Sequence, residues 1–585
     1  MFAGPIFVRE AITAPRRLSH YLLRSGYIAF LLVLMYTIRQ ATIGFQDTTF
    51  SGDIASYSNL VFGVFALLQL TFGMFFATLF TAANIAQEKD RRTLILLLMT
   101  DMRSRELTYG KLLASLLVVG VLAAASIPVF CALRLLGGVT WSQVFWVEAI
   151  IASTILASGA WGCMVAFWRE KTFQTLAISV LGVVLFVAVA EGMVALLGEM
   201  SSAGRWFAYA SPYRALLRIL NPLSDTTSGA VSISAIESVS LLLGVAIALS
   251  LYTVARLRVW NPSQLLKQSV IEEENPDEKS VPAAATNRKH RSVWNNPVSW
   301  KEIVTRGYGR KMVVIKLVYV FMAALIGYGV LSSGNRDGSL VLGMVSPAAA
   351  AFLAIGVISL LLVNAQAVTS ISTERDSNTL DILLATDISA REFMTGKIAG
   401  ALWNAREMIV VPLFLISWVA ATNRLASLTG ENLAYVVIAY AVLALFSAML
   451  GLHSGLTYEN SRSAIGNSLG TMFFLFVGIF IFMLLLVEAR SSFAIQMQSF
   501  IVFIGLGSIG LYSSLTHKNP SNALTIAAMM LPFLTFYAIT DFLLGGSLGV
   551  CFWICVAYGF AAIAMLIPSI SDFDVALGRT TNDAG

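Results

Sequence analysis

Long apolar stretches recur along the whole chain and constrain its fold more than any other feature of the sequence. Each is long enough for a helix of about 20 residues, which crosses a hydrocarbon core of ~30 Å. None alternates with the period of two that marks the strands of a membrane barrel. Only 12% of the residues are charged, against about 25% in soluble proteins. The sequence therefore predicts an all-α polytopic membrane protein.

A charged pattern occurs twice between these apolar runs. It reads EKDRRTLILLLMTDMRSRELTYGK at 88–111 and ERDSNTLDILLATDISAREFMTGK at 374–397. The residues shared by the two copies are Glu88, Asp90, Thr93, Leu94, Leu97, Thr100, Asp101, Arg105, Glu106, Gly110 and Lys111 in the first, and Glu374, Asp376, Thr379, Leu380, Leu383, Thr386, Asp387, Arg391, Glu392, Gly396 and Lys397 in the second. Chance matching would not keep charged residues and glycines in order, so the pattern predicts an internal repeat.

The repeat divides the chain into two halves, 1–260 and 296–585, joined by a polar and flexible cytoplasmic linker at 261–295. Each half has six expected spans, and because six is even the two repeats are parallel in the membrane. The expected spans lie at 22–43, 59–84, 110–135, 143–167, 174–198, 236–257, 313–333, 348–371, 398–421, 433–455, 465–488 and 546–567. An extra apolar segment near 500–515 leaves fourteen crossings open, but the spacing to the last span favours twelve.

The distribution of Lys and Arg orients the chain. They gather before the first span, between the second and third spans, and between the two halves. Cytoplasmic loops collect such residues, so we expect both termini in the cytoplasm and a location in a bacterial inner membrane. This distribution also accounts for the net charge of +6, which therefore indicates no nucleic-acid partner.

The local pattern of each copy predicts a short amphipathic helix, a break and a second helix. Ser389 and Glu392 have the spacing of a capping box, and Lys397 is placed to snorkel at the water boundary. The first copy has six basic and four acidic residues, and the second has three basic and five acidic, so their net charges are +2 and −2. A loop kept only for orientation would not become acidic, so we interpret the shared residues as a docking surface.

The repeated pattern closely resembles the cytoplasmic segment after the second span of ABC transporter type-2 permeases. The sequences GPIFVRE at 4–10 and NPVSWKE at 296–302 resemble the elbow helices of that family, and Pro212 and Pro520 resemble the start of its external re-entrant region. The resemblance implies an exporter whose shared residues contact two separate ATPase subunits through coupling helices. Where the family often has Pro, this chain has Asp101 and Asp387, which are suited to cap the next helix.

The chain itself carries no motif for ATP chemistry or metal binding. No G-x-x-x-x-G-K-[ST] sequence is present, so we expect no enzyme activity and no cofactor here, with ATP and Mg²⁺ on the partner. The histidines are scattered and indicate no metal site. The glycine pairs 451/455 and 466/470, and the GLGSIG stretch at 505–510, are interpreted as sites of close helix packing.

Polar residues inside expected spans are candidates for a transport pathway. They are Gln69, Glu191, Asn364, Gln366, Arg406 and Glu407, with Asp541 as a further intramembrane acid. Arg406 and Glu407 line the mouth of a pathway or satisfy neighbours in the bundle, and the sequence favours neither. Two other functions stay open: an ion-coupled secondary transporter, and a membrane scaffold or sensor that does not transport.

Overall fold

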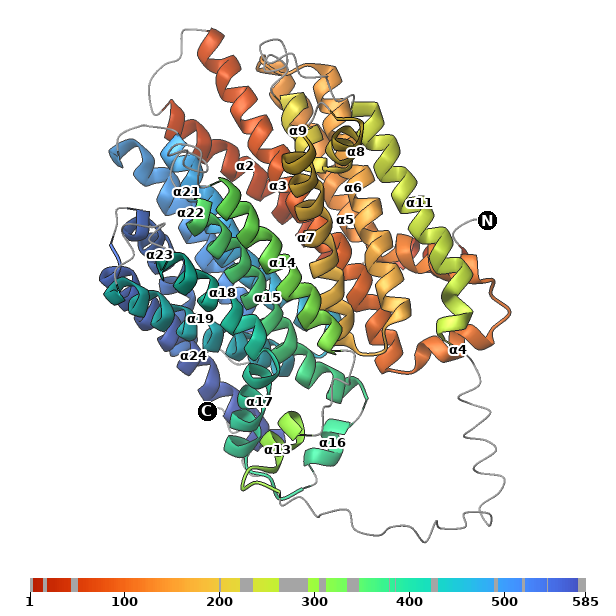
Figure 1. Ribbon diagram of the computed structural model, residues 1–585, viewed down its shortest axis with the longest axis vertical. Helices are drawn as coiled ribbons and strands as arrows, with labels where there is room; N and C mark the ends of the chain where they lie inside the picture. The colour runs from red at the N-terminus through yellow and green to blue at the C-terminus, as the bar shows by residue number, and fades with distance from the viewer. Residues whose placement is uncertain are drawn as a thin grey trace.

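The computed structural model describes residues 4–13, 18–43, 51–198, 201–220, 235–261, 293–304, 312–333, 347–377, 379–384, 386–421, 430–488, 493–517, 521–543 and 546–576. Every regular element in this part of the chain is a helix (Figure 1). The helices of the first half are α1(Gly4–Thr13), α2(Leu18–Thr42), α3(Ser51–Asp90), α4(Thr93–Met99), α5(Ser104–Leu135), α6(Trp141–Trp168), α7(Thr172–Leu197), α8(Ser202–Ala210), α9(Pro212–Leu220) and α11(Ala235–Trp260).

The second half follows a similar order and then adds to it. Its helices are α13(Pro297–Val304), α14(Met312–Ser333), α15(Pro347–Asp376), α16(Thr379–Leu384), α17(Ala390–Asn404), α18(Arg406–Ala421), α19(Gly430–Thr457), α20(Ser461–Phe473), the π-helical turn η4(Phe474–Gly478), α21(Ile479–Glu488), α22(Phe493–Leu515), α23(Asn522–Leu543) and α24(Leu548–Ala576). Both expected elbow segments are short helices, α1 and α13. Most of the predicted linker lies outside the described residues.

Twelve helices in the described residues are long and apolar enough to cross a membrane, or thirteen if the bent pair α17 and α18 counts as one span. This confirms an all-α polytopic fold. The twelve include Met497–Leu515 and Asn522–Phe542, which the span list from the sequence omitted. The expected span at 398–421 is the bent pair, with an angle of 53° at the break. The expected span at 313–333 is α14, whose apolar stretch Val313–Tyr328 is shorter than the twelve helices above.

Helix α22 runs the length of the bundle. Near its start, Ser499 donates to the carbonyl of Thr37 at the far end of α2, at 2.8 Å. At its other end, the carbonyl of Leu515 lies 3.0 Å from Nε2 of His453, near the last turn of α19. The preference for an extra segment that does not cross is therefore corrected. In this region the second half has two long helices, α22 and α23, where the first half has the short α8 and α9.

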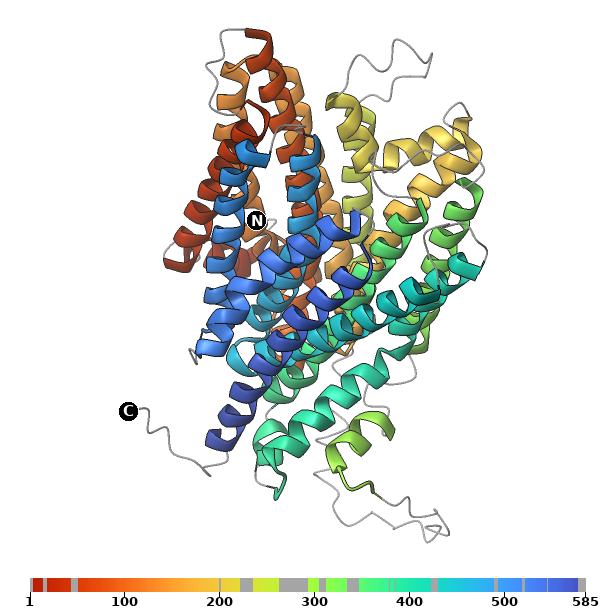
Figure 2. The same ribbon diagram turned by 90° about the vertical axis from the view of Figure 1, so that its left-hand side faces the viewer.

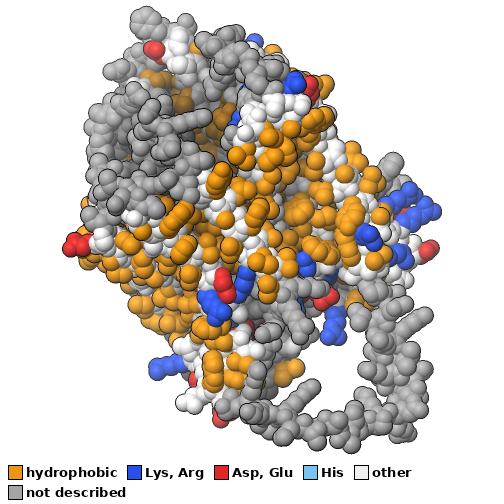
Figure 3. Space-filling view, in the orientation of Figure 1, with side chains coloured by type: hydrophobic (Ala, Val, Ile, Leu, Met, Phe, Trp, Pro, Cys, Tyr) orange, Lys and Arg blue, Asp and Glu red, His pale blue; other side chains and the backbone are white. Residues whose placement is uncertain are grey.

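The two halves meet along an apolar seam. The core of the second half takes in residues of the first, among them Leu79 of α3 and Phe173 of α7. The ring of Phe473 lies 4.9 Å from those of Phe72 and Phe75 across the seam. Helix α7 packs on α14 and α15, and α2 packs on α22, so that helices from both ends of the chain lie together (Figure 2). Hydrophobic side chains cover the middle of the visible face, and charged ones gather mainly toward its lower and right edges (Figure 3).

The length of α22 predicts the side of the membrane on which His517 lies. In a background without the four native cysteines, His517→Cys is expected to react with an impermeant maleimide from the same side as Thr100→Cys, because α22 and α23 form a complete out-and-back pair. Trp141→Cys, at the other end of the bundle, is the control and reacts from the opposite side. Labelling of His517→Cys together with Trp141→Cys would contradict the crossing of α22.

Candidate functional site

Each copy of the repeated pattern folds into a bracket at one end of the helix bundle. The first bracket, residues 88–111, is the end of α3, the short α4 and the start of α5; the second, residues 374–397, is the end of α15, the short α16 and the start of α17. The predicted order of helix, break and helix is therefore confirmed. At the first break, Arg92 has a φ of 58° and is the one non-glycine residue with positive φ in the described part of the chain.

A buried ion pair closes each bracket. Lys111 pairs with Glu88, and Lys397 Nζ lies 2.8 Å from Glu374 Oε2. The Lys397 side chain is only 1% exposed and also meets Glu302 of α13, at 2.6 Å. The expectation that Lys397 snorkels into water is corrected, because it is fully enclosed. These pairs tie the end of one long helix to the start of the next.

A basic residue beside each glutamate holds the end of another helix. Lys89 Nζ donates to the carbonyls of Phe167 at 2.6 Å and Arg169 at 2.8 Å, at the end of α6. Arg375 donates to Gly455 at 2.9 Å and to Tyr458, at the end of α19. A cation is favourable at these carbonyls, which have no partner within the helix. Lys89 and Arg375 occupy the same position of the two copies. The shared pattern did not include them because it was defined by identical residues, although both positions are basic.

The shared aspartates extend the same scheme to a fourth helix. Asp90 accepts a hydrogen bond from Thr172, the first residue of α7. Asp376 accepts one from Ser461, the first residue of α20. Each bracket therefore fixes the end of one long helix to three others in its own half.

Most other shared residues also serve the brackets internally. Thr93 and Thr379 donate to the carbonyls of Glu88 and Glu374, Thr100 and Thr386 donate to those of Leu97 and Leu383, and the Glu106 and Glu392 carboxylates accept from the amides of Arg103 and Ser389. The helix caps are Arg103 and Ser389, so the expectation that Asp101 and Asp387 cap these helices is wrong. Leu94, Leu97, Leu380 and Leu383 pack on the two cores.

The glycines of the pattern sit in tight packing. Gly110 and Gly396 are both buried. A Cβ on Gly396 would come within 2.7 Å of the Val298 side chain, so α13 approaches α17 closely only because this residue is glycine.

The brackets leave a small surface exposed at the end of the bundle. On α4 the side chains of Leu96 and Met99 are 65% and 63% exposed, and on α16 Ile382 is 67% exposed. The exposed charged residues described in the brackets are Arg91, Arg92, Asp101, Arg103, Arg105, Asp387 and Arg391. We define the exposed residues of each bracket as its docking surface. Exposed apolar side chains ringed by charges are typical of a protein–protein contact.

One ion pair joins the two brackets across the seam. The guanidinium of Arg91 lies 3.2 Å from Oδ1 of Asp376. The Asp376 side chain is 2% exposed and that of Arg91 is 44% exposed. Because Asp376 also holds Ser461, this link connects the first bracket to the helices of the second half.

The candidate pathway residues of the second half make contacts within the bundle. Glu407 accepts from Arg406 at 3.1 Å and from Lys316 at 2.6 Å, beside the bend between α17 and α18. Asn364 donates to the Ser447 carbonyl at 2.9 Å and accepts from Ser468 at 2.7 Å. These geometries favour the interpretation that the residues satisfy their neighbours. Gln366 differs, because both polar atoms of its side chain are buried and have no hydrogen-bond partner among the described residues.

The first half holds two further polar groups. Gln69 donates to the Ala123 carbonyl at 3.3 Å and lies 3.5 Å from Glu148, an intramembrane acid that the sequence search missed. At the end of the bundle away from the brackets, the Glu191 carboxylate accepts hydrogen bonds from Ser211 at 2.6 Å and from Arg214 at 2.7 Å. These bonds connect α7 to α9.

Beside this contact, burial raises the pKa of the Tyr213 phenol, so it stays protonated and meets the Thr71 hydroxyl at 3.0 Å. No hydrogen bond or ion pair found in the described residues joins the candidate pathway positions into one site.

Comparison of the chain with protein-family models, curated proteins and solved structures finds no match. Within the described residues, no group of three or more His, Cys, Asp or Glu side chains is arranged to hold a metal ion. The geometry of the brackets therefore carries the functional argument.

Because Lys397 closes the second bracket, we expect its substitution to lower the stability of the protein markedly. Lys397→Met is expected to lower the free energy of unfolding by about 3–5 kcal/mol, because it removes the cation that pairs with Glu302 and one of the two lysines, Lys397 and Lys301, that pair with Glu374. The measurement is unfolding of the purified protein in detergent. Arg391→Met, an exposed position on the same helix, is the matched control and should leave stability near that of the wild type. Equal effects of the two variants would show that the pair does not hold the bracket.

Proposed function

We propose that this chain is the membrane-spanning permease of an ATP-binding cassette exporter, driven by separate ATPase subunits that dock on α4 and α16. The observation that carries the proposal is the pair of brackets at one end of the bundle. Each presents exposed apolar side chains and is tied internally to long helices of its own half. A displacement of such a bracket moves the membrane helices with it, because ion pairs and hydrogen bonds connect the bracket to those helices.

The proposed mechanism is alternating access driven from the brackets. Closure of an ATPase dimer moves the two docking surfaces toward each other. Helices α3 and α15 end in the brackets, so they tilt with them. The net charges of +2 and −2 suit two different ATPase subunits, or one kind that tolerates both surfaces.

The alternative of an ion-coupled transporter is favoured by one observation, the Glu148 carboxylate beside Gln69 and Ser126. An intramembrane acid is a usual element of ion coupling. Transport that stops with Glu148→Gln but continues without ATP hydrolysis would support that function over the proposed one.

Docking is tested at the exposed apolar residues, since Glu88 and Glu374 are occupied by their lysines. Leu96→Glu with Met99→Glu is expected to release the ATPase from the first bracket, and Ile382→Glu from the second, because a charge cannot enter an apolar groove unpaired. The measurement is the number of ATPase subunits that co-purify with the permease from its native membrane.

Leu135→Glu is the matched control, because Leu135 is 81% exposed and lies at the other end of α5. The proposal expects two ATPase subunits with the wild type and the control, one with either bracket variant, and none with both. Two subunits retained by the double-bracket variant would refute docking at α4 and α16.

A further inference from the structure

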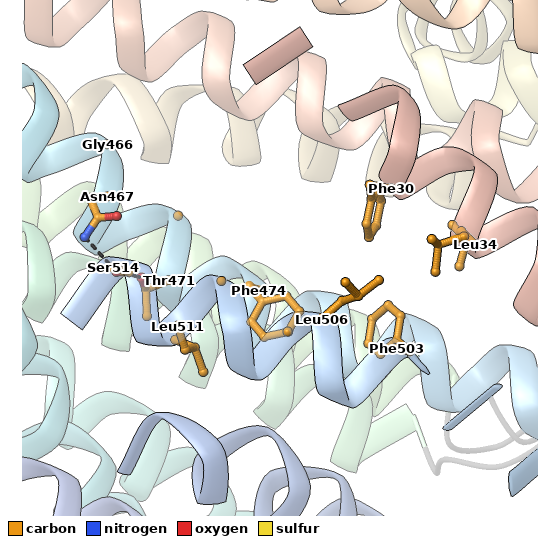
Figure 4. Close-up of a pocket in the computed structure, with 14 residues that line it drawn as sticks. Phe30, Leu34, Gly466, Asn467, Thr471, Phe474, Phe503, Leu506, Leu511 and Ser514 are labelled. Atoms are coloured by element: carbon orange, nitrogen blue, oxygen red, sulfur yellow. Dashed lines mark hydrogen bonds between the residues drawn. The ribbon is translucent and has the colours of Figure 1, made fainter. Parts of the chain in front are cut away.

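A cavity of about 350 Å³ lies between α2 of the first half and α20 and α22 of the second. Phe30 and Leu34 of α2 face Phe503 and Leu506 of α22 across it (Figure 4). Sites for small molecules have volumes of ~300–1,000 Å³. None of the six candidate pathway residues lines this cavity.

Two of the glycines that line the cavity border open space. A Cβ on Gly470 or on Gly510 would meet no other heavy atom within 4 Å. The interpretation of close packing is therefore wrong for Gly470, Gly505 and Gly510. It holds for Gly466, where a Cβ would come within 3.3 Å of the Phe80 ring, and for Gly507, where it would come within 2.3 Å of the Phe474 ring. It is confirmed for Gly451, where a Cβ would come within 2.6 Å of the Asn364 carbonyl. The π-helical turn η4 begins at Phe474, which lines the cavity, and such turns are frequent at functional sites.

One end of the cavity is polar and uncharged. Asn467 donates to the Ser514 hydroxyl at 2.8 Å, and the hydroxyls of Thr471 and Ser514 lie 3.1 Å apart (Figure 4). This end is near the brackets, because Tyr458, in the turn between α19 and α20, donates to the Ser514 carbonyl at 3.2 Å. None of the described residues that line the cavity is Lys, Arg, Asp or Glu, so this lining offers no cation for a phosphate.

The length and opening of the cavity fit an acyl chain. From Ser514 to Phe503 is eleven residues of α22, or about 16 Å at 1.5 Å per residue. That is about half of a ~30 Å hydrocarbon core, the depth of one leaflet. Leu506 lines the cavity and is 45% exposed, so the cavity reaches the apolar outer surface, where lipid is the surrounding solvent.

We propose that the cavity between α2, α20 and α22 binds one acyl chain of a neutral glycerolipid, with the ester and hydroxyl groups of the lipid at Asn467, Thr471 and Ser514. The apolar walls bury the chain, and the polar end supplies hydrogen-bond donors and acceptors for the glycerol ester. The inference is independent of the proposed function, since it concerns binding and requires no ATPase.

The test uses the full-length protein in detergent and a monoacylglycerol with a photoreactive diazirine in its chain. Mass spectrometry is expected to find the label on peptides of α2, α20 and α22. Gly510→Leu fills the cavity and should abolish this labelling. Gly505→Leu is the matched control, because its Cβ also meets nothing within 4 Å, yet Gly505 does not line the cavity. Labelling that persists in Gly510→Leu, or is lost equally in Gly505→Leu, would overturn the site.

Two more measurements complete the test. If Gly510→Leu is not monodisperse, Gly470→Leu fills the cavity from α20 and should abolish labelling in the same way. The polar end is tested by competition: unlabelled monoacylglycerol should compete better than an alkane of equal length, and Thr471→Val with Ser514→Ala should remove that preference. Equal competition by both in the wild type would refute the role of the polar end.

Discussion

A charge near a hydrocarbon core must be paired or must reach water, and this requirement shapes the end of the bundle at which the two brackets lie. Each bracket brings a Glu, a basic residue and an Asp together at the end of a long helix. The Glu meets a lysine of the next helix, the basic residue meets carbonyls at the end of another, and the Asp meets a hydroxyl at the start of a third. Three adjacent residues thereby set the positions of three neighbouring helices.

The brackets also separate what the two copies share from what differs between them. The shared Glu88, Asp90 and Leu94, with their counterparts in the second half, face inward. The exposed apolar residues are less alike: Leu96 corresponds to Ile382, and Met99 corresponds to Ala385 in sequence. Similar scaffolds thus present unlike surfaces.

How much of the fold and of the brackets the sequence can predict depends on whether the interacting residues are near or far apart in the sequence. Apolar length and the Ser389–Glu392 spacing are local, and they predicted the helices and the second bracket well. The partners of Lys397 and Arg375 lie on helices far away in sequence, so the sequence could not show that these side chains turn inward. Gly470 and Gly510 illustrate the same limit. A glycine in a membrane helix is compatible both with close packing of a second helix and with an empty space, and only the position of the neighbouring helix distinguishes the two. The duplication of the halves and the residues 261–295 between them stay predictions.

Helix α22 has a consequence for the protein within the plane of its membrane. On one flank, α7 of the first half packs directly on α14 of the second, while on the other flank α22 packs on α2. The two flanks of the molecule therefore differ in the helices that form them. Lipids diffusing around it meet two different walls, and a hydrophobic molecule moving sideways out of the bilayer meets the glycine-lined cavity from one flank.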